Sequence, residues 1–165
     1  MGLKTTLTTL LGGAALAASI PALAGGELSP NGPVAVAQAS PENLAKVIAG
    51  HVQKRDAAAI EQLFAPIELL EKVARCDDDD DDLRDDIRES RRELGKVIKK
   101  HGGSEFVRLE VDKQHEVAVG TRFEDCVAKE PLGWFEGDIH TSRGDDFDVD
   151  MIRIGDKWYI VDFDD

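Results

Sequence analysis

The hydrophobic periodicity of this chain changes at Gly102-Gly103, and this change constrains the fold more than any other feature of the sequence. Between residues 83 and 101, apolar side chains recur at helical spacing. After the glycines, Val107, Leu109 and Val111 alternate with charged residues, which is the period of a strand. Helices followed by antiparallel strands are the order of an α+β fold. The sequence therefore predicts N-terminal helices packed on an antiparallel sheet.

Capping residues and prolines divide the helical half into segments. Ser40-Pro41-Glu42 provides an N-cap, a first-turn proline and an early acid, which predict a first helix to about Gln53. Asp56 caps a second segment, in which Pro66 ends one helical piece and begins the next, through to Arg75. The long helix before the two glycines has acidic first turns and basic last turns, which match the helix dipole.

The strand half predicts two hairpins. Residues 107–111 and 117–123 alternate on either side of a tight connection at Asp112 to Gln114, and we expect them to pair. Residues 146–154 and 157–162 form the second hairpin around Gly155-Asp156. The segment between the hairpins, up to Gly144, has no regular period, so its structure is left open.

The N-terminus has the features of an export signal. Lys4 precedes an uncharged stretch, Thr5 to Ser19, and Ala22-Leu23-Ala24 has the small-x-small form of a cleavage site. The alternative is a membrane anchor, but the apolar run is shorter than the roughly 20 residues that span a bilayer. We therefore predict a signal peptide at 1–24, a flexible leader at 25–39, and one α+β domain at 40–165. The processed protein is expected to be soluble and periplasmic or secreted.

The chain is strongly acidic. It has 33 Asp and Glu residues against 20 Lys and Arg, a formal net charge of −13. Such a surface repels phosphate backbones and anionic lipid headgroups. Neither a nucleic acid nor a membrane surface is expected as a partner.

The two cysteines of the chain, Cys76 and Cys126, both follow the predicted signal peptide. An oxidising compartment favours a disulfide between them, and closing a loop of this length stabilises the fold by on the order of 4 kcal/mol in the chain-entropy model. The alternative is two unpaired thiols. A zinc site would need further ligands, and no histidine neighbours either cysteine.

Two stretches carry a family resemblance. Residues 55–66 (RDAAAIEQLFAP) and 155–162 (GDKWYIVD), with a helical half before a sheet half, resemble the NTF2-like, cystatin-like superfamily. This resemblance implies a cone-shaped curved antiparallel sheet around the helices, with a pocket in the cone, and a possible homodimer. Family members include isomerases, dehydratases, hydrolases and exported domains without known activity, so the fold does not select a function. The resemblance transfers no catalytic residue and no cofactor.

Two acidic clusters are candidate sites. The first is a run of six aspartates, namely Asp77, Asp78, Asp79, Asp80, Asp81 and Asp82. Carboxylates are calcium ligands, but the run lacks the spacing of an EF-hand loop, so the simpler interpretation is a solvated start to the long helix. In the second cluster, strand alternation places Asp146, Asp148 and Asp150 on one face. That face is either solvent-exposed or the interior of the cone, where Asp148 or Asp150 could act as a general base.

Other candidate residues are a histidine and three aromatic side chains. His140 lies among aromatic and acidic residues and is a candidate acid or base. Trp134, Trp158 and Tyr159 either pack in the core or line a ligand cavity.

These observations favour an exported domain that binds a small molecule or a protein without catalysis, and no cofactor is predicted. One alternative is a small NTF2-like isomerase, dehydratase or hydrolase that uses an acid or His140 in the cone. Another is an acidic protein that binds divalent cations through the aspartate run.

Overall fold

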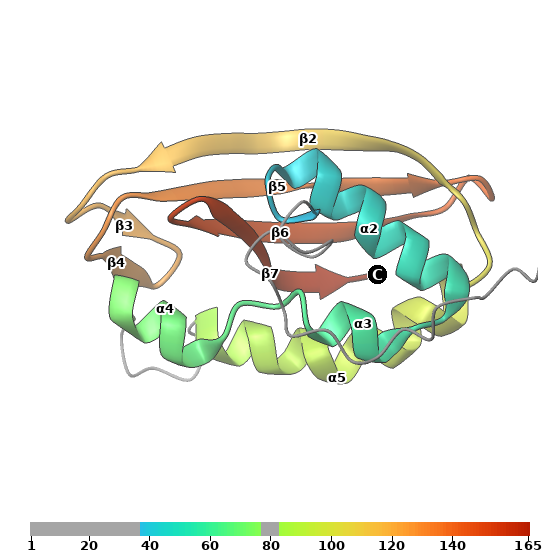
Figure 1. Ribbon diagram of the computed structural model, residues 1–165, viewed down its shortest axis with the longest axis horizontal. Helices are drawn as coiled ribbons and strands as arrows, with labels where there is room; N and C mark the ends of the chain where they lie inside the picture. The colour runs from blue at the N-terminus through green and yellow to red at the C-terminus, as the bar shows by residue number, and fades with distance from the viewer. Residues whose placement is uncertain (1–36, 77–82) are drawn as a thin grey trace, which may run out of the picture.

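The computed structural model describes residues 37–76 and 83–165 (Figure 1). The predicted signal peptide, most of the predicted leader and the aspartate run 77–82 lie outside these ranges. Ala37 and Gln38 are buried, and the Gln38 carbonyl accepts a hydrogen bond of 2.8 Å from the Trp158 amide. The packed domain thus includes the last residues of the segment predicted to be a flexible leader.

Within residues 37–76, helices α2, α3 and α4 precede the first strand. Ser40 caps α2 (Pro41–Lys54) through a hydrogen bond from the Asn43 amide to its hydroxyl. Asp56 caps α3 (Ala57–Glu61) in the same way, and α4 (Ile67–Val73) begins after Pro66. The predicted second segment ends earlier than Arg75, because Ala74–Cys76 is extended and forms strand β1.

The long helix α5 (Leu83–His101) ends where the two glycines predict. Gly103 has a φ of 88°, a left-handed conformation that glycine adopts without steric cost. The buried face of α5 is the predicted one, and it consists of Leu83, Ile87, Ser90, Leu94, Val97, Ile98 and His101. The helix lies along the last strand of the sheet, where the Ser90 hydroxyl accepts a hydrogen bond of 3.1 Å from the Phe163 amide.

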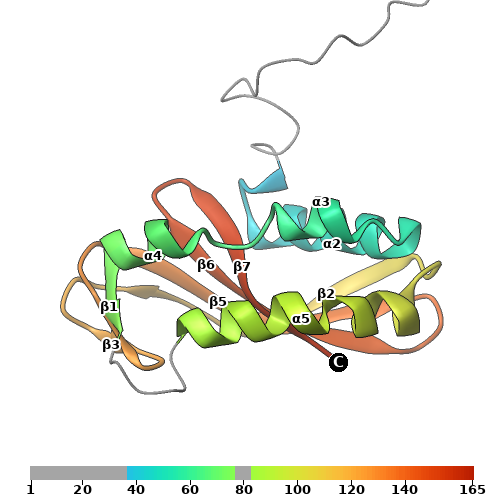
Figure 2. The same cartoon turned by 90° about the horizontal axis from the view of Figure 1, so that it is seen from below.

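The main sheet is antiparallel, with the order β2-β5-β6-β7. Its strands are β2 (Phe106–Val117), β5 (Leu132–Thr141), β6 (Asp146–Ile154) and β7 (Lys157–Asp164). In Figure 1, β2 forms the upper edge and α5 runs below β7, beyond the opposite edge, while Figure 2 separates α2, α3 and α4 from α5. Helices and antiparallel sheets together confirm the predicted α+β class.

The first predicted hairpin is wrong, whereas the second is confirmed as β6 and β7. Strand β2 continues through Asp112 to Gln114, where the pairing with β5 shifts in register between Val111 and Lys113. One additional residue in the strand was therefore mistaken for a turn. The partner of β2 is β5, which lies in the segment without regular period, because this central strand is buried along most of its length.

A second, three-stranded sheet has the order β1-β4-β3 and contains the cysteine pair. Its other strands are β3 (Arg122–Phe123) and β4 (Cys126–Ala128). Cys76 lies directly opposite Cys126 in the β1–β4 ladder, with their sulfur atoms at disulfide-bonding distance. This arrangement fits the predicted disulfide.

Aromatic side chains fill much of the space between the helices and the sheet. Phe147 packs edge-on against Phe163, with ring centroids 5.2 Å apart, and contacts the buried His101 ring at the same distance. Across residues 37–76 and 83–165, no helix combines the length and apolar composition needed to cross a bilayer.

Candidate functional site

Acidic side chains from three adjacent strands meet on one face of the main sheet. Glu136 and Asp138 of β5 lie opposite Asp150 and Asp148 of β6, and Asp150 lies opposite Asp162 of β7. They surround an open hollow of about 250 Å³, which we name the acidic sheet hollow. Its lining residues are Asp112, Glu136, Gly137, Asp138, Asp148, Asp150 and Asp162.

Strand alternation explains why the carboxylates gather there. Along β6, Phe147, Val149 and Met151 are fully or almost fully buried, so the intervening aspartates project from the opposite face. Asp148 is exposed, and Asp150 is half-buried. The predicted common face therefore exists, and it lies in the sheet where β5 and β7 add further acids.

Asp138 and Asp148 form a carboxyl–carboxyl pair across β5 and β6. A hydrogen bond with Asp148, together with burial and the nearby negative charge, raises the pKa of Asp138 to about 6. The Asp138 carboxyl group therefore keeps its proton to a higher pH than an ordinary aspartate.

Asp150 of β6 lies between Glu136 of β5 and Asp162 of β7. Its pKa is raised to about 7, first by burial and then by the negative charges of Asp162 and Glu136. A carboxyl group in this state is partly protonated at neutral pH and ionises when a positive charge approaches. The hollow can thus release protons as it binds a cation.

Glu136 is the one acid of the hollow with a cationic partner in the described ranges. Lys113 of β2 lies 2.7 Å from its carboxylate, and the Trp134 indole N–H donates a bond of 2.6 Å to the same oxygen. Burial opposes ionisation of Glu136, but these two hydrogen bonds lower its pKa overall. Glu136 is therefore ionised, and the positive charge of Lys113 already balances its negative charge.

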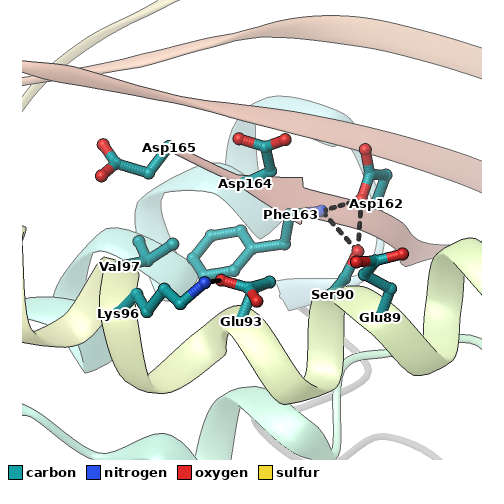
Figure 3. A pocket seen from close by; sticks show the side chains of 9 residues that line it. All are labelled: Glu89, Ser90, Glu93, Lys96, Val97, Asp162, Phe163, Asp164 and Asp165. Atoms are coloured by element: carbon teal, nitrogen blue, oxygen red, sulfur yellow. Dashed lines mark hydrogen bonds and ion pairs between the residues drawn. The ribbon is translucent and has the colours of Figure 1, made fainter.

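A second acidic depression adjoins the hollow, and we name it the α5–β7 groove. It has a volume of about 400 Å³ and includes Asp162, which also lines the hollow. Figure 3 shows Ser90 and the Phe163 amide turned toward Asp162, and Lys96 turned toward Glu93. The groove is lined by Glu89, Ser90, Glu93, Lys96, Val97, Asp162, Phe163, Asp164 and Asp165.

His140 lies on the acidic face, at one end. Its Nε2 is 3.0 Å from a Glu110 carboxylate oxygen, and its Nδ1 is 3.5 Å from Asp146. The imidazole therefore joins β2, β5 and β6, and it does not line the acidic sheet hollow. This placement gives His140 a bridging role between strands.

The aromatic candidates lie mainly in packed regions. Trp134 and Trp158 are only 2% and 5% exposed, and their rings pack against Phe123 and Phe135. Tyr159 is half-buried and packs against the core. The two hollows described above are lined by other residues.

The predicted cation site cannot be placed, because Asp77 to Asp82 lie outside the described residues. Within the described ranges, no group of three or more His, Cys, Asp or Glu side chains has a geometry that could hold a metal ion.

Comparisons with known proteins return no significant similarity. No protein-family model matches the chain, and neither a curated protein nor a solved structure matches it.

Sequence reasoning identified the β6 acids but missed Glu136, Asp138 and Asp162. The signal was present, because Glu136, Asp138 and His140 alternate at a period of two. It became informative only once β5 was known to pair with β6.

Proposed function

We propose that this protein is an exported binding domain of NTF2-like architecture without catalytic activity, and that its acidic sheet hollow binds a basic protein segment. The observation that carries the proposal is the convergence of five carboxyl groups from β5, β6 and β7 in one open hollow. Lysine and arginine side chains are the protein groups that complement such a surface.

The protonation of the hollow supports a cationic ligand. The pKa of Asp138 is raised to about 6, first by its hydrogen bond with Asp148, and the pKa of Asp150 is raised to about 7, first by burial; neighbouring negative charges add to both shifts. A bound guanidinium or ammonium group would offset that repulsion and favour ionisation. Binding is therefore expected to tighten as pH rises from 5 to 8.

The shape of the acidic region favours an extended segment over a compact small molecule. The hollow and the α5–β7 groove share Asp162, so acids continue from the sheet face to the edge next to α5. Arginine side chains spaced along an extended peptide could contact both depressions at once.

The test uses fluorescence anisotropy with a labelled oligo-arginine peptide at low salt. The double variant Asp148→Asn/Asp150→Asn should weaken binding by about tenfold, or about 1.4 kcal/mol. The matched control Glu61→Gln/Glu68→Gln removes two exposed acids from the α3–α4 region, and it has the same net charge. Equal losses in both double variants would mean that only overall charge matters, and would refute the site.

A small NTF2-like enzyme is the second candidate, and the environment of Asp150 favours it. A half-buried carboxyl group with a pKa near 7 is suited to general base catalysis. Native mass spectrometry of the protein from its producing cells separates the two functions. A retained small molecule that Asp150→Asn loses supports the enzyme, whereas release of a basic peptide by the same variant supports the binding domain.

A further inference from the structure

The two edges of the main sheet differ in how they are covered. Helix α5 lies along the β7 edge, where the Ser90 hydroxyl accepts a hydrogen bond from the Phe163 amide of the strand. Strand β2 forms the other edge, and no described strand pairs with its outer side (Figure 1). Val107 and Val111 of β2 are 56% and 52% exposed. An exposed edge strand, with backbone amide and carbonyl groups open on its outer side, is a template for pairing with another chain.

A hollow lies beside this edge. It has a volume of about 630 Å³ and is bounded by the beginning of α2, including Pro41, and by Phe106, Leu109 and Val111 of β2. An additional strand on the β2 edge would place alternate side chains at the mouth of this hollow.

The sequence of β2 is complementary to itself in one antiparallel register. With a two-fold axis at Leu109, Arg108 of each copy lies opposite Glu110 of the other. The same axis places Val107 opposite Val111. Charged pairs and apolar pairs thus match at the centre of the strand.

The match is specific to this register. Moving the axis to Glu110 or to Arg108 sets that residue against its own copy, which places like charges together.

We propose that a second copy of this chain occupies the β2 edge, forming a two-fold antiparallel dimer centred on Leu109. Register shifts between Phe106 and Arg108 and between Val111 and Lys113 bound the regular part of the strand. The contact is therefore short, and the dimer forms at high protein concentration. The axis is perpendicular to the sheet, so the acidic sheet hollows of both copies face the same side.

Charge exchange tests the proposed register. Sedimentation velocity is measured over a concentration series for the natural protein and for Arg108→Glu and Glu110→Arg. Each single variant places like charges opposite each other in its own dimer, and should dimerise at least about tenfold more weakly. In an equimolar mixture of the two variants, every central pair is again of opposite charge, so the mixed dimer should form.

The controls are Arg92→Glu and Glu68→Arg, which make the same charge changes at exposed helical positions. These variants should dimerise like the natural protein. Hydrogen exchange of the natural protein gives an independent test, because β2 amides should gain protection as concentration rises. A protein that stays monomeric, or variants whose mixture fails to dimerise, would overturn the proposal. The dimer and the peptide-binding site are tested separately, since neither charge exchange alters an acid that lines the hollow.

Discussion

At the scale of single residues, the main feature is negative charge held where it is costly to ionise. Asp150 is half-buried among Asp162 and Glu136, and its pKa is raised to about 7. In an unfolded chain the same group titrates near its ordinary value, so the folded protein holds an additional proton between pH 4 and 7. Folding stability from this group is therefore present at low pH and decreases as pH rises through that window.

Replacing Asp150 with asparagine should remove this dependence. We expect Asp150→Asn to raise the free energy of unfolding at pH 8 by on the order of 2 kcal/mol, with little change at pH 4. Urea denaturation at both pH values measures it, and Glu130→Gln, an exposed acid outside the hollow, serves as control. An equal effect at both pH values would show that burial of the charge is not the cause.

Ser90 is the residue that joins α5 to the sheet edge. Its hydroxyl is buried, accepts from the Phe163 amide and contacts the Asp162 carboxylate. Ser90→Ala should lower the free energy of unfolding by about 1–3 kcal/mol, because the Phe163 amide and the Asp162 carboxylate each lose one hydrogen-bond partner and keep only the bond between them. Ser142→Ala, which removes an exposed hydroxyl that accepts from the Glu105 amide, should cost less. Equal losses in thermal denaturation would contradict this role.

At the scale of elements, the disulfide joins strands β1 and β4 within the small sheet. Cys76 and Cys126 are 50 residues apart in sequence. The double variant Cys76→Ser/Cys126→Ser should lose about 2–4 kcal/mol of stability in chemical denaturation. Reduction of the natural protein should give a similar loss, and an unchanged midpoint after reduction would show that the bond contributes little.

The elements that sequence predicted correctly are those with strong local signals. Ser40, Asp56 and Gly103 mark helix ends through their own caps and dihedral angles, so α2, α3 and α5 begin or end where expected. Strands β2 and β5 were misjudged because their pairing is not local. Asp112 resembles a turn residue but is accommodated as a register shift, and the first four residues of β5 are buried without alternation.

The same distinction holds for the candidate site. The alternation of Asp148 and Asp150 is visible in one strand, whereas their meeting with Asp138 and Asp162 requires the order of β5, β6 and β7. Whether Trp134 and Trp158 line a pocket or pack in the core likewise depends on tertiary packing, because the sequence is compatible with both.

At the scale of the whole molecule, the helices and the small sheet leave one acidic surface open. Within the described ranges, six acids line the acidic sheet hollow and five line the α5–β7 groove, with Asp162 common to both. Long-range attraction to a basic partner is therefore expected to be steep in salt. Raising ionic strength from 0.05 to 0.5 M shortens the screening length about threefold, and should weaken oligo-arginine binding by at least about tenfold. Salt-independent affinity would contradict an electrostatic site.

The most direct test of the central claim is a carbon-detected NMR titration of the aspartate and glutamate carboxyl groups with oligo-arginine peptide at pH 7. We predict that the carboxyl resonances of Asp138, Asp148, Asp150 and Asp162 shift together and that the apparent pKa of Asp150 falls from about 7 as peptide binds. Shifts confined to acids outside the hollow, with these four unchanged, would contradict the account.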